Sequence, residues 1–383
     1  MKLLNLVGAR PQIIKASAVS RAIKNHFYNH IEEVIVHTGQ HYDANMSGIF
    51  FNELQLTKEK YNLNVGSSSH AQQTAQMLTG LEEIALKEKP DAVIVYGDTN
   101  STLAGSLAAA KLHIPVIHIE AGMRSFNKKM PEEINRICCD HVSTLLFSPT
   151  KTGFDNLVNE GFDKNALPPY SADNPKIYHC GDVMLDNSIY FKTIAAEKSK
   201  ILAQHELEEN KFVLATIHRE SNTDTGENLN NLFSAFHDIS QREKIKFIIP
   251  LHGRTKKMLG QNLKAKLYSE IINNSFLKII DPVSFLDMIL LESSATLIMT
   301  DSGGVQKESY FFKKPCIILR NETEWVELTV QGTAVLCGTE KEKIRKAFDF
   351  FKGKPGLKYP EIFGDGKAAE FICSEIINNI KSS

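Results

Sequence analysis

Residues 297–308 read Leu-Ile-Met-Thr-Asp-Ser-Gly-Gly-Val-Gln-Lys-Glu, and this stretch contains the most specific pattern in the chain. Its first four residues are apolar or β-branched, which is typical of a buried parallel strand. Gly303 and Gly304 allow a tight turn into a helix that Ser302 is placed to cap. Backbone N–H groups at the positive end of such a helix suit a phosphate, and Glu308, within the first two turns, suits ribose hydroxyls. The stretch predicts a strand–turn–helix unit with an anion site; the alternative is a turn that needs glycine only for its geometry.

The same strand-then-helix rhythm recurs on both sides of this stretch. Short runs rich in Val, Ile and Leu alternate with segments of helical spacing, which is the signature of an open α/β sheet. Three prolines within residues 167–175 interrupt the rhythm. We therefore predict two Rossmann-like domains, 1–172 and 173–365, and a helix over 366–383 that packs on the first domain. The predicted strands are 3–7, 34–37, 92–96, 116–119, 145–147, 176–180, 212–216, 247–251, 277–280, 297–300, 316–319 and 334–336, and the predicted helices of the first domain include 13–27, 71–87, 101–112 and 132–141.

The length predicts two domains, and the cysteine pattern and hydropathy predict a cytoplasmic protein. At 383 residues the chain exceeds the roughly 250 to 300 residues at which a single core stops growing. Its net charge of -1 gives no electrostatic excess for a nucleic acid or an anionic membrane as partner. The six cysteines show no C-x-x-C spacing, and no stretch approaches the ~20 apolar residues of a membrane span. We expect reduced thiols and no leader or membrane segment.

Carboxylates follow two strands of the first domain and begin one of its helices. Asp98 follows the strand 92–96, Glu120 follows 116–119, and Glu132 stands at a probable helix start. Carboxylates that converge can be held at different pKa values, as an acid and a base on two faces of a substrate require. The alternative is that Asp98 and Glu132 are helix N-terminal caps.

The loops after the first two strands are also polar. Residues 8–11, Gly-Ala-Arg-Pro, place Arg10 and then Lys15 near the positive end of a helix, which suits an anion. An ordinary turn with surface cations is the alternative, and the run lacks the full G-x-G-x-x-G pattern of a dinucleotide site. Residues 37–43, His-Thr-Gly-Gln-His-Tyr-Asp, are typical of a binding loop. Metal ligation by two of its histidines would need a helix and further ligands, so we predict no metal.

Histidine and arginine follow two neighbouring strands of the second domain. His218-Arg219 comes after the strand 212–216, and His252 and Arg254 come after 247–251. Arginine forks match phosphate oxygens and histidine can donate to them, so these residues suit a diphosphate. The alternative for each histidine is a satisfied polar residue at a strand end.

Taken together in this order, the motifs closely resemble those of the non-hydrolysing UDP-N-acetylglucosamine 2-epimerase family. The resemblance spans nearly the whole chain, and the joint occurrence of the motifs makes it specific. It implies a glycosyltransferase-B fold, in which two Rossmann-like domains face each other across a cleft, with no redox cofactor or metal and with a homodimer as the assembly. The motifs are Gly8-Ala9-Arg10-Pro11, His37-Thr38-Gly39-Gln40-His41, Gly97-Asp98-Thr99, Glu120-Ala121-Gly122-Met123-Arg124, Pro131-Glu132-Glu133-Ile134-Asn135-Arg136, His218-Arg219, Asp301-Ser302-Gly303-Gly304 and Gly364-Asp365-Gly366.

The resemblance also implies a reaction and residue roles. UDP is eliminated in the anti sense across C1 and C2 of a UDP-linked 2-acetamido sugar, a 2-acetamidoglucal forms, and UDP returns as C2 is reprotonated on its other face. The implied proton-transfer carboxylates are Asp98, Glu120 and Glu132, and His218 would stabilise the departing diphosphate. The implied substrate-binding residues are Arg10, Lys15, Arg136, His252, Ser302, Gly303, Gly304 and Glu308.

Two departures from the best-known UDP-GlcNAc enzymes concern the sugar. Within 320–327, Trp325 stands where those enzymes have an arginine, and the loop before Pro131 is shorter and presents Met130 in place of an aromatic residue. Both features resemble the subgroup that acts on UDP-2,3-diacetamido-2,3-dideoxyglucuronate or on 2-acetamido-6-deoxy-L-hexose nucleotides. Glu220 is displaced from the glutamate of the family's H-R-x-E-N motif and is given no role. UDP-GlcNAc is the predicted substrate with these sugars as alternatives, and a glycosyltransferase, a hydrolysing epimerase or a nucleotide-sugar sensor of the same fold are the rival functions.

Overall fold

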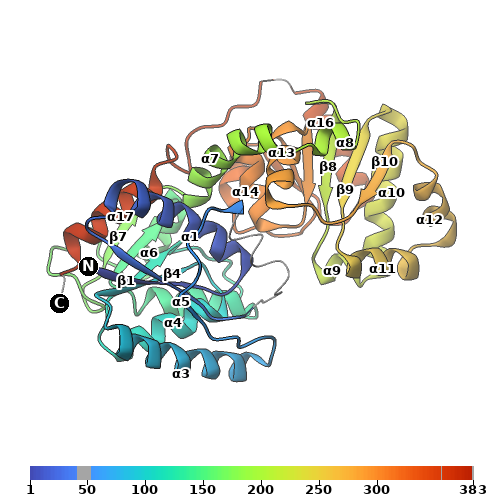
Figure 1. Ribbon diagram of the computed structural model, residues 1–383. Helices are drawn as coiled ribbons and strands as arrows, with labels where there is room; N and C mark the ends of the chain where they lie inside the picture. The colour runs from blue at the N-terminus through green and yellow to red at the C-terminus, as the bar shows by residue number, and fades with distance from the viewer. Residues whose placement is uncertain (41–52, 355, 382–383) are drawn as a thin grey trace. The chain divides into compact units, whose positions relative to one another are not determined.

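The computed structural model describes residues 1–40, 53–354 and 356–381, and the chain divides into two compact units. The first unit contains residues 1–189 and 361–383, and the second contains residues 190–360. Within each unit, helices cover a parallel sheet (Figure 1). Each unit is therefore an α/β fold with a core of its own.

The sheet of the first unit is parallel throughout, with the order β3-β2-β1-β4-β5-β6-β7 among its described strands. Its runs of Val, Ile and Leu are buried, as expected where helices cover both faces. The edge strand β3 was not predicted, because two residues are too few to show a periodic pattern. The strands are β1 (Lys2–Val7), β2 (Glu32–His37), β3 (Tyr61–Asn62), β4 (Ala92–Tyr96), β5 (Val116–Ile119), β6 (Leu145–Ser148) and β7 (Lys176–His179).

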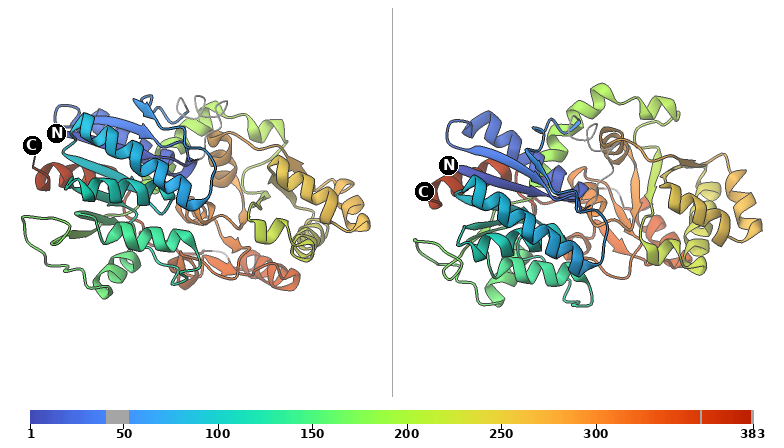
Figure 2. Two further views of the ribbon diagram at one scale, coloured as in Figure 1. Left: turned by 90° about the horizontal axis from the view of Figure 1, so that it is seen from below. Right: turned by 60° about the horizontal axis from the view of Figure 1, so that its bottom comes forward.

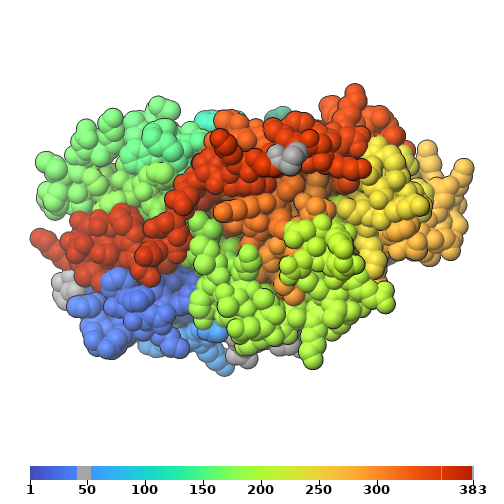
Figure 3. Space-filling model, turned by 90° about the horizontal axis from the view of Figure 1, so that it is seen from above, coloured from blue at the N-terminus to red at the C-terminus, as the bar shows by residue number. Residues whose placement is uncertain are grey.

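The helices of the first unit form a layer on each side of this sheet. On one side α3, α4 and α5 pack next to one another, and on the other α1 and η1 pack with α17 (Figures 1 and 2). Figure 3 shows the C-terminal segment, in red, lying against the N-terminal segment, in blue. The helices are α1 (Arg10–Ala22), η1 (Ile23–Phe27), α3 (His70–Glu88), α4 (Asn100–Lys111), α5 (Pro131–Asp140), α6 (Lys151–Asn159) and α17 (Ala368–Asn379), and α7 (Val183–Lys198) begins in this unit and ends in the second.

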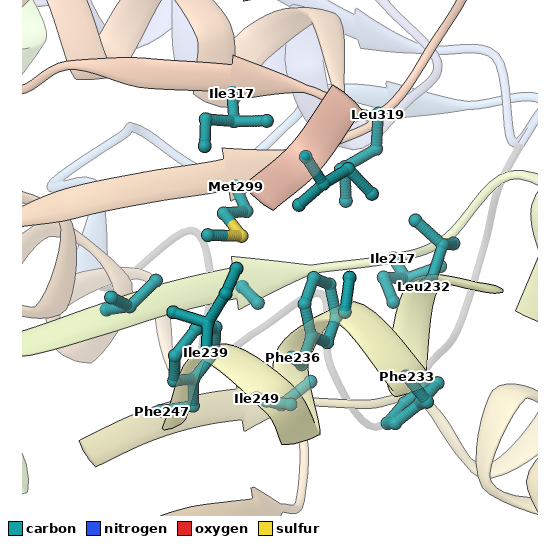
Figure 4. Close-up of a cluster of buried hydrophobic side chains, with 14 of the residues drawn as sticks. Ile217, Leu232, Phe233, Phe236, Ile239, Phe247, Ile249, Met299, Ile317 and Leu319 are labelled. Carbon is teal, nitrogen blue, oxygen red and sulfur yellow. The ribbon is translucent and has the colours of Figure 1, made fainter. Parts of the chain in front are cut away.

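The sheet of the second unit has the order β10-β9-β8-β11-β12-β13 and is also parallel. Aromatic and aliphatic side chains from α10 and the strands interlock in its core (Figure 4). The strands are β8 (Phe212–Thr216), β9 (Lys246–Pro250), β10 (Leu277–Ile280), β11 (Leu297–Thr300), β12 (Cys316–Ile318) and β13 (Ala334–Leu336). The helices are α8 (Ile201–Gln204), α9 (Glu220–Thr223), α10 (Gly226–Glu243), α11 (Gly253–Asn262), α12 (Ala265–Ile272), α13 (Phe285–Ser294), α14 (Gly303–Phe311), α15 (Val326–Val330) and α16 (Lys341–Lys352).

The boundary between the units lies further along the chain than the sequence predicts. The strand β7, assigned above to the second domain, pairs with β6 in the sheet of the first unit. Tyr178 on β7 stacks on Phe147 of β6 with ring centroids 4.8 Å apart. The proline-rich segment is therefore a connection within the first unit, and the division falls at 189/190, inside α7. Proline marks a break in secondary structure, which need not be a break between domains.

The strand order reverses between β1 and β4 in the first unit and between β8 and β11 in the second. Ligands of open parallel sheets bind beyond the carboxyl ends of the strands at such reversal points. The residues that follow β1, β4, β8 and β11 are therefore the first candidates for a functional site. Over the described part of the chain, no helix combines the length and the apolar character needed to cross a membrane.

Candidate active site

Asp98 lies in the turn between β4 and α4. Thr99, and not Asp98, caps α4, because the Oγ1 atom of Thr99 accepts from the N–H of Thr102 at 3.4 Å. The carboxylate of Asp98 instead forms an ion pair with Arg136 on α5, and about a quarter of its side chain is exposed (27%). The helix-cap alternative is therefore wrong for Asp98.

The surroundings of Asp98 favour its protonated form. Burial raises the pKa of Asp98 above its ordinary value, and the charge of Glu120 acts in the same direction. The cations Arg136 and Lys15 oppose this rise. The balance places a carboxyl group of raised pKa beside a second carboxylate, which is the arrangement that acid and base catalysis on one substrate requires.

Glu120 follows β5 in a conformation that few residues other than glycine adopt. Its φ is 76°, which costs on the order of 1–3 kcal/mol, and such outliers cluster at functional sites. Its Oε1 atom lies 2.5 Å from Nζ of Lys15, and both side chains are largely buried. A Cβ atom on Gly97 would lie 3.1 Å from that Nζ and 3.4 Å from that Oε1. The structure therefore brings the turn of Asp98 together with Glu120 and Lys15.

The two glutamates at the start of α5 have different surroundings. Glu132 is half-buried, and within the described chain its carboxylate has no hydrogen bond or ion pair; Met130 occupies the N-cap position, so the cap alternative is wrong here too. Glu133 is buried and accepts hydrogen bonds from Ser125, Phe126 and Arg136. Burial alone would raise the pKa of Glu133, but these hydrogen bonds hold it below its ordinary value.

Glu133 holds Arg136 in place for its pairing with Asp98, and the sequence analysis missed this role. The Nη1 atom of Arg136 lies 3.0 Å from Oε2 of Glu133, while its Nη2 atom contacts Asp98. The spacing i, i+3 puts Glu133 and Arg136 on one face of a helix, and this signal could have distinguished Glu133 from Glu132.

In the turn after β1, the backbone N–H groups of Gly8 and Ala9 already donate to a side chain and are not available to bind an anion. The Oε1 atom of Gln12 accepts from the N–H groups of Gly8 and Ala9 at 2.9 and 3.1 Å. Its Nε2 atom donates to the carbonyl of Tyr96 at 2.9 Å, which ties this turn to β4. Arg10, the first residue of α1, is exposed. Gln12 is a further residue that the sequence analysis missed, because its partners lie in the turn and on another strand.

The described residues of the loop after β2 form hydrogen bonds with one another and with the start of α4. Nδ1 of His37 accepts from the N–H of Gly39 at 2.9 Å, and burial lowers the pKa of His37. The side chain of Gln40 accepts from Ser101 at the start of α4. His41, which the metal alternative needed, lies outside the described residues with the rest of the predicted binding loop. Across the described ranges, no group of three or more His, Cys, Asp and Glu side chains is arranged to hold a metal ion.

In the second unit, Asp301 organises the ends of β8 and β11. Its buried carboxylate accepts from the N–H of His218 at 3.0 Å, from the N–H of Arg219 at 3.0 Å and from the amide of Asn222 at 3.0 Å. The ring of His218 lies 5.2 Å from the ring of His252, centroid to centroid. The predicted pair of histidines is therefore brought together, and Asp301 is the buried acid that holds one of them.

The glycine-rich turn opens α14 as predicted, but one detail differs. Ser302 occupies the N-cap position, yet its side chain makes no capping hydrogen bond. A Cβ atom on Gly303 would lie 2.3 Å from Oε1 of Glu324, whose Oε2 atom pairs with Arg320 at 3.1 Å. Gly303 is therefore needed for the close approach of a neighbouring loop, besides the geometry of the turn.

Trp325 and Glu308 both lie in the interior around α14. The Nζ atom of Lys307 lies 4.2 Å from the ring centroid of Trp325, and both side chains are buried. A cation thus remains beside position 325 although tryptophan replaces the expected arginine. Burial raises the pKa of the neighbouring Glu292 well above its ordinary value, and the charge of Glu308 adds to this effect.

A depression of about 400 Å³ lies between the N-terminal ends of α3, α4 and α5, apart from the acid cluster. Its lining is mainly Ala, Leu, Ile and Pro and shares with the surroundings of Asp98 only the amides Asn100 and Asn135. It does not offer the charged groups that a diphosphate requires.

Comparison with solved structures defines the class of protein to which this fold and site belong. The structure is similar to that of the UDP-GlcNAc 2-epimerase from Methanocaldococcus jannaschii in complex with UDP-GlcNAc and UDP, with a TM-score of 0.85 and 41% identity over 99% of this chain and 100% of that one. The class is that of the carbohydrate epimerases. A family model described as UDP-N-acetylglucosamine 2-epimerase matches residues 22–377, and the chain belongs to this family.

Two curated relatives cover almost the entire chain. A UDP-N-acetylglucosamine 2-epimerase homolog from Methanococcus maripaludis is 49% identical over 99% of this chain and 100% of its own length. A UDP-2,3-diacetamido-2,3-dideoxy-D-glucuronate 2-epimerase from Pseudomonas aeruginosa is 46% identical over 97% of this chain and 98% of its own.

Proposed function

We propose that this enzyme inverts C2 of a UDP-linked 2-acetamido sugar, with UDP-GlcNAc as the substrate, by anti-elimination of UDP and its re-addition to a 2-acetamidoglucal. The observation that carries the proposal is the cluster in which Asp98 pairs with Arg136 and Glu120 pairs with Lys15 at the strand ends of one sheet. One carboxylate would remove the C2 proton, and the other would return a proton to the opposite face. Glu132, half-buried at the start of α5, is the third proposed proton-transfer group.

The diphosphate site proposed for the second unit supports the same chemistry. A C2 hydrogen becomes acidic only as positive charge develops at C1, so the leaving diphosphate must be stabilised while the base acts. His218 would donate to the leaving group, and the N-terminus of α14 at Ser302, Gly303 and Gly304 would bind phosphate. Arg10 and His252 would also contact the substrate, and Glu308 the ribose.

We further propose that residues of both units take part in the reaction: the acids of the first unit act on the sugar, and residues of the second unit bind its diphosphate. Exclusion of water from the bound sugar would protect the glycal or its oxocarbenium precursor, which water would otherwise trap. The reversal points of the two sheets are the places where each unit is expected to bind its share of the ligand.

Exchange of the C2 hydrogen tests the reaction directly. Incubation with UDP-GlcNAc in heavy water should give deuterium at C2, measured by NMR. Asp98→Asn should slow this exchange by roughly 10²- to 10⁴-fold, which is the usual contribution of a general base, with UDP affinity retained. Asp155→Asn, which changes an exposed acid on α6, is the matched control and should exchange at the wild-type rate.

Three outcomes would contradict the proposal or part of it. Absence of C2 deuteration with UDP-GlcNAc and with the alternative sugars below would exclude epimerisation of these substrates. UDP release that requires an added acceptor would instead identify a glycosyltransferase. Unchanged turnover in Asp98→Asn would remove Asp98 from the mechanism.

A second candidate substrate is UDP-2,3-diacetamido-2,3-dideoxyglucuronate. The observations that favour it are the replacement of an arginine by the buried Trp325 beside Lys307 and the 46% identity to an enzyme named for that sugar. A deoxy-L-hexose nucleotide is the third candidate. Comparison of kcat/KM for the three nucleotides decides among them, and a ratio of at least tenfold would identify the preferred sugar.

We also propose a homodimer, which the family resemblance implies. Light scattering coupled to size-exclusion chromatography tests it, because the chain of 42.9 kDa would then elute with about twice that mass. A mass of one chain across the concentrations used for activity would refute the dimer.

A further inference from the structure

His118 lies in β5 with both ring nitrogens close to acceptor atoms. Nδ1 is 2.6 Å from Oδ1 of Asp140, and Nε2 is 2.8 Å from the carbonyl oxygen of Gly97. Neither a carboxylate nor a carbonyl oxygen can donate a hydrogen bond. With Asp140 ionised, as its contacts with Arg124 and the N–H of Gly122 favour, both contacts are satisfied only if both nitrogens of His118 carry hydrogen, that is, if the side chain is an imidazolium.

The contacts continue from Asp140 towards the surface. Oδ2 of Asp140 accepts from the N–H of Gly122 at 3.1 Å and lies 2.7 Å from Nη2 of Arg124. Arg124 in turn makes two hydrogen bonds to Glu160, at 2.7 and 2.6 Å. Cations and anions alternate along this chain of contacts. Each buried charge therefore has a partner of opposite sign, which offsets the free-energy cost of removing it from water.

The network ties together the two turns that carry the proposed acids. Gly97 immediately precedes Asp98, and Gly122 lies two residues after Glu120. We propose that His118 is a positioning residue for epimerisation, because its imidazolium, held by Asp140, fixes the turns of Asp98 and Glu120 relative to each other. This inference rests on the proposed function of those two acids.

The electrostatics agree with this geometry. Burial alone would lower the pKa of His118, but Cys139 and Asp140, which face it from α5, raise that pKa well above its usual value. Burial acts to raise the pKa of Asp140, but His118 and then Arg124 hold it below its ordinary value. The imidazolium is therefore expected to persist through the neutral range.

Nitrogen-15 NMR of the histidine side chains tests the charge state without any assay of activity. Both ring nitrogens of His118 should give the shifts of protonated nitrogen between pH 6 and pH 8. The signal is assigned by its loss in His118→Gln. A neutral tautomer in this pH range would overturn the proposal.

A double-mutant cycle tests the positioning role. His118→Gln leaves an amide able to donate to Gly97 but turns its oxygen towards the Asp140 carboxylate. The added change Asp140→Asn supplies a donor to that oxygen and retains an acceptor for Gly122 and Arg124. We expect His118→Gln to lower kcat for C2 exchange about a hundredfold, since displaced catalytic groups lose rate on this scale, with KM within about threefold. The double variant should recover about tenfold of that loss.

Three outcomes separate this inference from simpler accounts. A folded His118→Gln enzyme with kcat near the wild-type value would overturn it, as would a double variant no faster than the single one. Glu33→Gln is the control, because Glu33 is a partly buried acid of the same sheet. It accepts hydrogen bonds from Ser20 and Asn5, so its loss should lower thermal stability without this loss of kcat. If His118→Gln does not fold, Asp140→Asn alone should show the kcat loss. Absence of exchange in the wild-type enzyme would instead count against the proposed function.

Discussion

The pairing of Asp98 with Arg136 sets how the proposed base responds to pH. Burial raises the pKa of Asp98, and Arg136 and Lys15 bring it part of the way back. Glu133 keeps Arg136 in position from the same face of α5. A carboxylate whose pKa is raised in this way is a stronger base than an ordinary aspartate, which favours its proposed role in proton transfer.

Replacing Arg136 by glutamine should move the acidic limb of the activity profile to higher pH. The base must be ionised to act, and loss of the cation that lowers its pKa leaves it protonated over a wider range. An opposite charge at contact distance shifts a carboxyl pKa by 1–3 units, so we expect the limb to move by about one pH unit. The measurement is kcat/KM for C2 exchange between pH 5 and pH 9.

Arg345→Gln is the control for this experiment, because Arg345 pairs with Asp238 and Glu342 at the surface of the second unit. Its profile should match that of the wild type. A limb that does not move in Arg136→Gln would show that Asp98 is not the group that titrates in that limb.

At the scale of elements, the turn from β4 into α4 shows how the backbone makes room for the acid cluster. Gly97 has a φ of 62° and lies against the Lys15–Glu120 pair, while its carbonyl accepts from His118. Thr99 then starts α4 with a capping hydrogen bond. Asp98 therefore lies between two fixed residues, Gly97 and Thr99. It follows the carboxyl end of β4, where the strand order of the sheet reverses.

Gly97→Ala should impair catalysis more than stability. The left-handed backbone costs an alanine about 1–2 kcal/mol, and the new methyl group would crowd Nζ of Lys15 and Oε1 of Glu120. We expect kcat for C2 exchange to fall at least about tenfold as the pair is displaced. Gly66→Ala has a similar φ of 69° with no atom within 4 Å, so it should share the cost in stability and keep its kcat. Equal kcat in the two variants would contradict this explanation.

At the scale of the whole molecule, the two units have separate hydrophobic cores. In the second unit, Phe233 and Phe236 of α10 pack with Phe247 and with aliphatic residues of the strands (Figure 4). The first unit also contains residues 361–383, which return to it after the second unit is complete, and their helix α17 packs on α1 and η1. The units should therefore unfold as distinguishable parts.

Phe236→Ala should destabilise the second unit selectively. Truncation of a fully buried phenylalanine costs about 3–5 kcal/mol, because a cavity replaces packed side chains. Hydrogen exchange measured by mass spectrometry should show lost protection within residues 190–360 and little change within 1–189. Phe147→Ala is the reciprocal variant in the first unit. Loss of protection spread evenly over both units would show that they unfold as one.

Local sequence patterns predicted the strands of this protein but not the roles of residues that act through contacts distant in the sequence. The predicted strands match the observed ones to within a residue or two, because an apolar run before a polar turn is visible in a few consecutive positions. The roles of Gln12, Glu133 and Asp301 were missed, because each acts through hydrogen bonds to backbone or side chains that local pattern does not connect. The boundary at 172/173 was wrong for a related reason: only the pairing of β7 with β6 shows which sheet the strand joins.

The sequence by itself determined the α/β rhythm of strands and helices, the positions of the acids and glycines at strand ends, and the family. These features follow from residue order and short-range periodicity, both of which can be read from the sequence alone. Only the tertiary structure decided that Asp98 pairs with Arg136, that Glu120 pairs with Lys15 and that His118 spans two turns. Such contacts join residues from different strands and helices, and their distances depend on how the sheet and its helices pack.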